Sequence, residues 1–182
     1  MTATEVLTES DLAEFRIFEG LDAADRTALL ERMELHKYPP NDRILREGLS
    51  IQILWVIVKG HCAVTKTIDE DDQRNLAEIG PGDIFGEMSF FRSAPHSASI
   101  KTLTDVEVLM LRRDKYDELE ATGSPAAYRI ATNTAAVLAE RLRRMDDWVG
   151  DLVEKPDAAS HKEEWQQFRS NVYTNWDFER PL

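Results

Sequence analysis

The sequence is 182 residues long, which is enough for one domain with a hydrophobic core and additional helices. Acidic residues outnumber basic ones by 34 to 22, so the formal net charge of −12 argues against direct binding to nucleic-acid phosphates. No apolar run approaches the ~18 residues of a membrane span, the N-terminus does not resemble a secretory signal, and the one cysteine, Cys62, allows no internal disulfide. These features exclude a membrane partner and predict a cytoplasmic protein.

The first two thirds of the chain predict short helices followed by strands. Helices are expected at 9–18 and 22–33, the second capped by Asp22. After a turn at 39–42, short β-type runs alternate with turns containing glycine, proline or acidic residues, at 51–58, 62–67, 76–79, 97–102 and 106–111. This spacing indicates an antiparallel sandwich, jelly roll or barrel.

Helical sequence returns after residue 112. A short helix is expected at 114–120, and Gly123-Ser124-Pro125 then provides a break, a cap and a first-turn proline for a long helix that extends to about residue 153. Apolar residues recur along the long helix at intervals of three and four, with a dimer seam of Leu138, Leu142, Met145, Val149 and Leu152. This repeat favours a homodimer, although the helix could instead pack on its own sheet.

The chain after Pro156 is rich in aromatic residues, including Trp165, Phe168, Trp176 and Phe178. It is expected to fold back on the body, because two free tryptophans would be exposed otherwise, while a lid or docking peptide is the alternative. We therefore divide the chain into a flexible N-terminus (1–8), helices with a β-roll (9–122), a long dimerisation helix (123–155) and an aromatic tail (156–182).

Several fragments, in this order, resemble the cyclic nucleotide-binding domain family of the catabolite activator and kinase regulatory subunit type. They are the entry segment IFEGLDAADRTALLERMELHKYPPNDRILREG, the hairpin LWVIVKGHCAVTK, and the phosphate-binding cassette PGDIFGEMSFF followed by PHSASI. The resemblance covers about residues 12–153. It implies an α+β fold: an antiparallel β-roll (double-stranded jelly roll) flanked by short N-terminal helices and a long C-terminal helix.

The resemblance implies roles for the cassette residues. Gly86 would let the backbone approach a cyclic phosphate, and Glu87 would accept a hydrogen bond from the ribose 2′-hydroxyl. The remaining cassette contacts would come from Met88, Ser89, His96, Ser97 and Ala98, whereas Phe90 and Phe91 are expected to pack in the core.

His96 departs from the family pattern, because cyclic-nucleotide binders carry an arginine nine residues after the glutamate. Replacing a fixed, forked cation by a largely neutral imidazole removes about 1.5–3 kcal/mol of phosphate binding. A protonated His96 could still hold one negative charge, and the affinity would then rise as the pH falls. Alternatively, His96 is a surface loop residue and the cassette is only structural.

The segment ERLRRMDDWVGDL resembles the dimer helix of the same family, which would place Arg141 and Asp146 at the ligand. A carboxylate only accepts hydrogen bonds, so Asp146 suits the N–H donors of guanine better than the mixed edge of adenine. The predicted ligand is cyclic GMP or cyclic AMP, with Asp146 as a solvated charge as the alternative.

No nucleophile, phosphate-loop or spaced histidine motif is present, so neither an enzyme, a metal site nor a required cofactor is expected. The residues after 153 are too few for the family's usual helix-turn-helix. We expect a sensor or regulatory module that signals to a protein partner through its long helix and tail, without direct nucleic-acid binding. A ligand-free dimerisation or docking scaffold is the main alternative, and a regulator that acts through a partner's DNA-binding domain is a third.

Overall fold

The computed structural model describes residues 3, 7–69 and 72–153. The chain divides into two units, Met1–Thr134 and Ala135–Leu182. The first unit holds the helices and sheets described below up to the first turns of the last helix. The second unit contributes the rest of that helix, and the aromatic tail lies outside the described residues.

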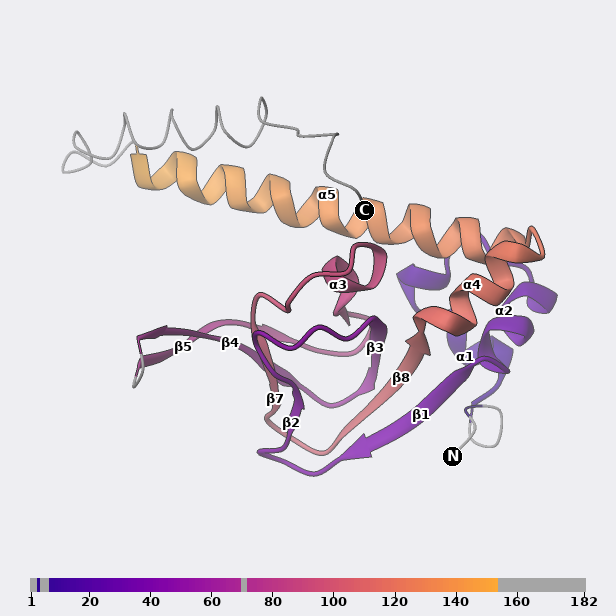
Figure 1. Cartoon of the computed structure of the whole chain (residues 1–182), viewed down its shortest axis with the longest axis horizontal. Coiled ribbons are helices and arrows are strands. Elements are labelled where there is room, and N and C mark those ends of the chain that lie inside the picture. The colour runs from indigo at the N-terminus through magenta and orange to yellow at the C-terminus, as the bar shows by residue number, and fades with distance from the viewer. Residues whose placement is uncertain (1–2, 4–6, 70–71, 154–182) are drawn as a thin grey trace. The chain divides into compact units, whose positions relative to one another are not determined.

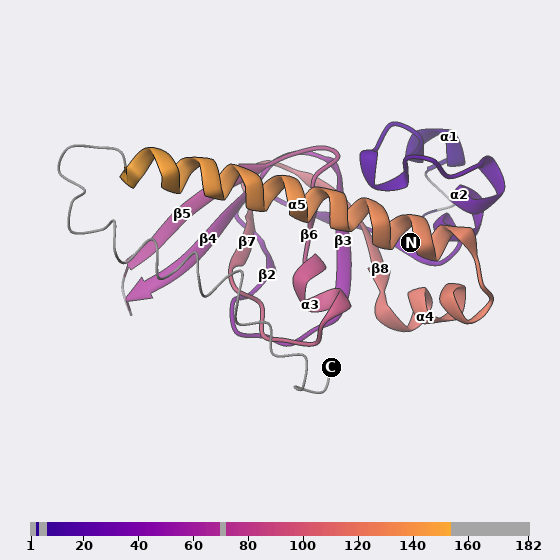
Figure 2. The ribbon, with the colours of Figure 1, turned by 90° about the horizontal axis from the view of Figure 1, so that it is seen from above.

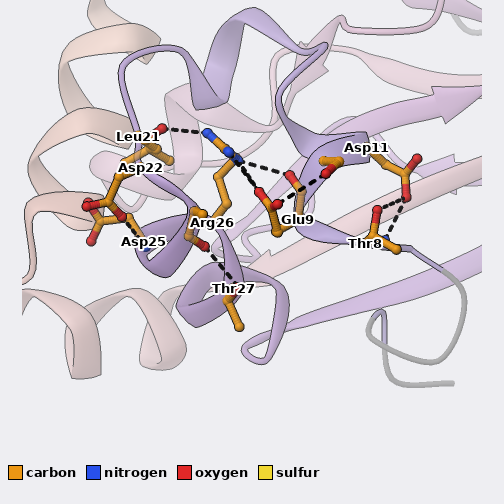
Figure 3. Close-up of polar contacts among 10 residues, drawn as sticks. Thr8, Glu9, Asp11, Leu21, Asp22, Asp25, Arg26 and Thr27 are labelled. Atoms are coloured by element: carbon orange, nitrogen blue, oxygen red, sulfur yellow. Dashed lines mark hydrogen bonds and ion pairs between the residues drawn. The ribbon is translucent and has the colours of Figure 1, made fainter.

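Three short helical segments begin the first unit: α1 (Glu9–Leu12), the 3₁₀ turn η2 (Arg16–Phe18) and α2 (Ala23–Leu30). Asp22 caps α2 as expected, accepting a 2.8 Å hydrogen bond from the backbone amide of Asp25. Arg26 joins the segments, because its guanidinium donates to the carboxylate of Glu9 at 2.7 Å and to the carbonyl of Leu21 at 2.6 Å (Figure 3). The single helix predicted at 9–18 is therefore wrong: the chain turns after α1.

Two four-stranded antiparallel sheets form a β-roll (Figure 1). One has the order β1-β8-β3-β6 and the other β2-β7-β4-β5. Their strands are β1 (Met33–Tyr38), β2 (Arg43–Leu45), β3 (Ile53–Lys59), β4 (Cys62–Asp69), β5 (Asp72–Ile79), β6 (Ile84–Phe85), β7 (Ser99–Thr102) and β8 (Val106–Arg112). The expected β-roll is confirmed, but the sequence did not predict β1, β2 or β6, and it placed Met33 in a helix.

The hydrophobic core lies between the two sheets. It contains side chains from both, namely Leu45, Trp55, Ile57, Cys62, Phe85, Ile100, Val106 and Val108, all at most 5% exposed. Trp55 stacks on Phe85 with 5.2 Å between ring centroids. Burial raises the pKa of the Cys62 thiol to about 11, so this cysteine is packed as an inert apolar group.

Three helices follow within or after the sheets: α3 (Glu87–Phe91), α4 (Arg113–Ala121) and α5 (Pro125–Val153). The predicted start of the long helix is confirmed, since Pro125 is its first residue and Ser124 Oγ accepts from the amide of Ala126 at 3.2 Å. No helix in the described part of the chain combines the length and apolar character needed to cross a bilayer.

The first turns of α5 are fixed from two sides. Tyr116 of α4 donates its hydroxyl to the Ala127 carbonyl at 3.1 Å, and the Asn133 amide donates to the carbonyls of Ile17 at 3.0 Å and Glu19 at 2.9 Å. Figure 2 shows α4 on one side of this part of α5 and the N-terminal helices on the other. The first unit thereby holds α5 up to Thr134 at a defined position.

Candidate functional site

Gly86 opens the cassette in a conformation that suits only glycine. Its φ is +78°, and it forms the N-cap of α3. A Cβ at this position would lie 2.5 Å from Trp55 Cε3 and 2.6 Å from the Ile53 carbonyl oxygen. Both the left-handed backbone and the close approach of Trp55 therefore require the absence of a side chain here.

The short helix α3 is anchored at its end and lacks a side-chain cap at its start. Its first backbone bond runs from the amide of Phe90 to the Gly86 carbonyl at 3.0 Å, so the amides of the preceding turn have no acceptor within the helix. The Phe90 carbonyl accepts from Gln52 Nε2 at 3.0 Å, and the Phe90 ring is fully buried against Tyr116. The expected core role of Phe90 is confirmed.

The Glu87 side chain of the cassette is buried although it is charged. Glu87 is 6% exposed, whereas Met88, the next residue, is 61% exposed. A carboxylate at this depth requires partners, and Glu87 has an interaction in the structure. Its position directly after Gly86 combines a buried acceptor with the amide-lined start of α3.

His96 is buried as well, which contradicts the alternative that it is a surface loop residue. It is 5% exposed, its Nδ1 lies 3.0 Å from Ser89 Oγ, and its ring meets Trp55 edge-on at 6.1 Å between centroids. Its backbone also pairs with the neighbouring loop, accepting from Gly48 and donating to Leu49 at 2.9 Å each. In place of a cation, the cassette therefore holds an imidazole that ties the chain before β7 to α3.

The surroundings of His96 favour the neutral ring. Burial lowers its pKa below the usual 6.5, and the nearby backbone of Ile51 offsets part of this shift. Among the described residues, Nε2 has no hydrogen bond of good geometry, although it is buried. The imidazole is thus neutral near pH 7 in the structure as it stands.

The other predicted ligand residues are distributed over both units. Ser97 is exposed and Ala98 half-buried, just before β7 begins at Ser99 rather than at the predicted residue 97. Arg141 and Asp146 lie in the part of α5 that belongs to the second unit, each with an interaction of its own. Their contact with a ligand stays a prediction.

The predicted dimer seam also lies in the second unit. Leu142 is 39% and Met145 40% exposed, so these two apolar side chains are accessible on the described helix. Leu138 belongs to the same helix, and the side chains of Val149 and Leu152 lie outside the described residues. Self-association through this seam stays a prediction.

A separate cavity was not anticipated from the sequence. It has a volume of about 350 Å³ and is lined by Arg43, Arg46, Glu47, Thr67 and Ser99. The sequence offered a pair of arginines three residues apart, a spacing that Arg141 and Arg144 also show. Within residues 3, 7–69 and 72–153, no three His, Cys, Asp or Glu side chains come together to hold a metal ion.

Comparison with known proteins relates the chain to regulators. Residues 35–122 match the family described as the cyclic nucleotide-binding domain. A CRP-like cAMP-activated global transcriptional regulator of Mycobacterium tuberculosis is 30% identical over 78% of this chain and 62% of that protein. The crystal structure of Thermus thermophilus catabolite activator protein is similar at a TM-score of 0.66, with 32% identity over 75% of this chain and 62% of that one.

The fold is also shared with a cyclic nucleotide-binding domain from Methylobacillus flagellatus, at a TM-score of 0.69 and 24% identity over 77% of this chain and 79% of that chain. The chain thus spans 62% of the length of the Mycobacterium regulator, and these relatives are named as regulators or binding domains. Residues 35–122 of this chain belong to the cyclic nucleotide-binding domain family, as the fragments around the cassette indicated.

Proposed function

We propose that this chain is a non-catalytic sensor module that binds cyclic AMP or cyclic GMP at the cassette and signals through α5 to a protein partner. The observation that carries the proposal is the buried Glu87 carboxylate, placed directly after the positive-φ Gly86 at the start of α3. The carboxylate would accept the ribose hydroxyl, and the amides of the first turn would face the cyclic phosphate. The relatives named as cAMP-activated regulators support the same ligand class.

The signalling step would use the exposed apolar residues of α5. Ligand bound beside α3 would favour one position of the long helix over another through differential contacts, and this shift would reach a second copy or a partner. Leu142 and Met145 offer the apolar surface for such contact. A homodimer, and the absence of direct nucleic-acid contact by this chain, are part of the proposal.

A ligand-free scaffold is the second candidate, and one observation favours it. The Ser89–His96 bond and the Trp55 contact already fix α3 without a ligand, using the position at which the family's binders carry an arginine. In such a domain the cassette would be a permanent part of the core, and α5 would serve only for assembly.

Calorimetric titration of the whole chain with cyclic AMP and cyclic GMP distinguishes the two candidates. A sensor should bind one of them, and His96→Arg should tighten binding about tenfold to a hundredfold because it restores a charge-assisted phosphate contact. His36→Arg adds the same charge at a half-buried position on β1 and should leave the affinity unchanged. Absence of binding by both the parent and His96→Arg would refute the sensor and leave the scaffold.

A further inference from the structure

The unanticipated cavity lies on the outer face of one sheet. Its wall crosses three neighbouring strands, β2, β7 and β4. Ile100 points into the core, so Ser99, its neighbour on β7, faces the opposite side of the sheet. Thr65 pairs with Ser99, and Thr67 follows two residues later on the same face. The cavity therefore shares no lining residue with the Gly86–His96 site.

Two arginines that line the cavity are not engaged in interactions within the protein. Neither the Arg43 nor the Arg46 guanidinium has a hydrogen-bond or ion-pair partner among the described residues, and both side chains are exposed. Several other arginines of the first unit are paired, as Arg26 is with Glu9 and Arg113 with Asp117. In a chain with a net charge of −12, two unpaired arginines beside one concavity form a local site for a planar or tetrahedral anion.

The third charged group of the cavity is held in place by the sheet. The Glu47 carboxylate accepts from the amide of Thr67 through Oε2 at 3.0 Å, and the Glu47 amide donates to Ser99 Oγ at 2.9 Å. Ser99 is 4% exposed, and this part-buried bond links the chain just after β2 to β7. The second carboxylate oxygen, Oε1, remains as an acceptor for a hydroxyl group next to the anion site.

We infer that this cavity is a second ligand site, which takes a small phosphate ester with free hydroxyl groups, such as a sugar phosphate. Arg43 and Arg46 hold the phosphoryl group, while Glu47 accepts from a hydroxyl of the ligand. The volume of about 350 Å³ lies within the range of small-molecule sites, and three of the lining residues, Arg43, Thr67 and Ser99, lie on strands. Ligand binding at this cavity does not require a cyclic nucleotide at the cassette.

The test is calorimetric titration of the whole chain with ribose 5-phosphate and, separately, with inorganic phosphate. Arg43→Gln and Arg46→Gln should each weaken binding of ribose 5-phosphate about tenfold to a hundredfold, because each removes a charge-assisted contact. Arg112→Gln removes the same charge from an exposed position on the other sheet and should leave the affinity unchanged.

Glu47→Gln provides a test that separates the two probes. It removes a like charge near the phosphoryl group of both, but only ribose 5-phosphate also loses a strong acceptor for its hydroxyl, so the substitution should shift the preference towards inorganic phosphate. Thermal unfolding of each variant checks that the fold is retained. Failure of ribose 5-phosphate to bind, or binding that neither arginine substitution changes, would overturn the inference.

Discussion

Gly86→Ala should destabilise the protein more than Gly123→Ala, although both glycines have a left-handed backbone. The left-handed backbone costs an L-residue about 1–2 kcal/mol, and both Gly86 (φ +78°) and Gly123 (φ +68°) adopt it. Only Gly86 adds a packing term, since the new Cβ would lie 2.5 Å from Trp55 Cε3, whereas Gly123 has no atom within 4 Å of that position. Overpacking costs about 1–3 kcal/mol, which gives a total of about 2–5 kcal/mol for Gly86→Ala.

Urea unfolding followed by far-UV circular dichroism measures both variants, with Gly123→Ala as the matched control. Any gain from restricting the unfolded chain is similar for the two alanines and cancels in their difference. We expect a lower midpoint with an unchanged slope for Gly86→Ala, and a loss of only about 1–2 kcal/mol for Gly123→Ala. Equal losses in the two variants would show that the contact between Trp55 and Gly86 does not constrain the cassette.

Three further predictions concern a buried titratable group, the seam and the base of α5. The pKa of His96 is lowered in the folded state, so the unfolded chain takes up a proton at higher pH than the folded protein does. The free energy of unfolding should therefore fall as the pH drops below 6.5. In urea titrations, His96→Gln should make the free energy of unfolding less dependent on pH. Leu142→Asp should reduce the molar mass measured by light scattering, because an unpaired charge in a helix seam costs several kcal/mol. Arg143→Asp should leave the molar mass unchanged. Equal molar masses for the two variants would contradict a dimer seam at Leu142. Tyr116→Phe loses a buried 3.1 Å hydrogen bond and about 0.5–1.5 kcal/mol of stability, but Tyr128→Phe, at a side chain 68% exposed, should change the melting midpoint little.

The order of helices and strands could be predicted because local signals mark it. The helix α5 begins at Pro125, directly after Ser124, and the turn between β3 and β4 contains Gly60, so these residues mark the element boundaries in the sequence. The strand β1 was missed although its burial alternates at the start, with Met33 and Leu35 buried and Glu34 exposed. A six-residue strand whose partner, β8, follows about seventy residues later is not distinguishable by local pattern from the end of a helix.

The cassette illustrates the same limit for the site. The positive φ of Gly86 could be expected from the family fragment, as could the burial of Phe90. The contact between His96 and Trp55 joins residues forty-one positions apart, and the bond to Ser89 depends on how α3 packs on β3. Neither contact leaves a trace in the spacing of residues, so the sequence could not show that the imidazole is turned inward.

The two hydrogen bonds from Asn133 to the carbonyls of Ile17 and Glu19 have a mechanical consequence. Any tilt of the base of α5 must either break both bonds or carry η2 along with it. Since Arg26 links α2 to α1, such a tilt would move α1, η2 and α2 together. Residues 7–30 would then move in any response, and a bulky protein fused ahead of Glu9 would slow that movement.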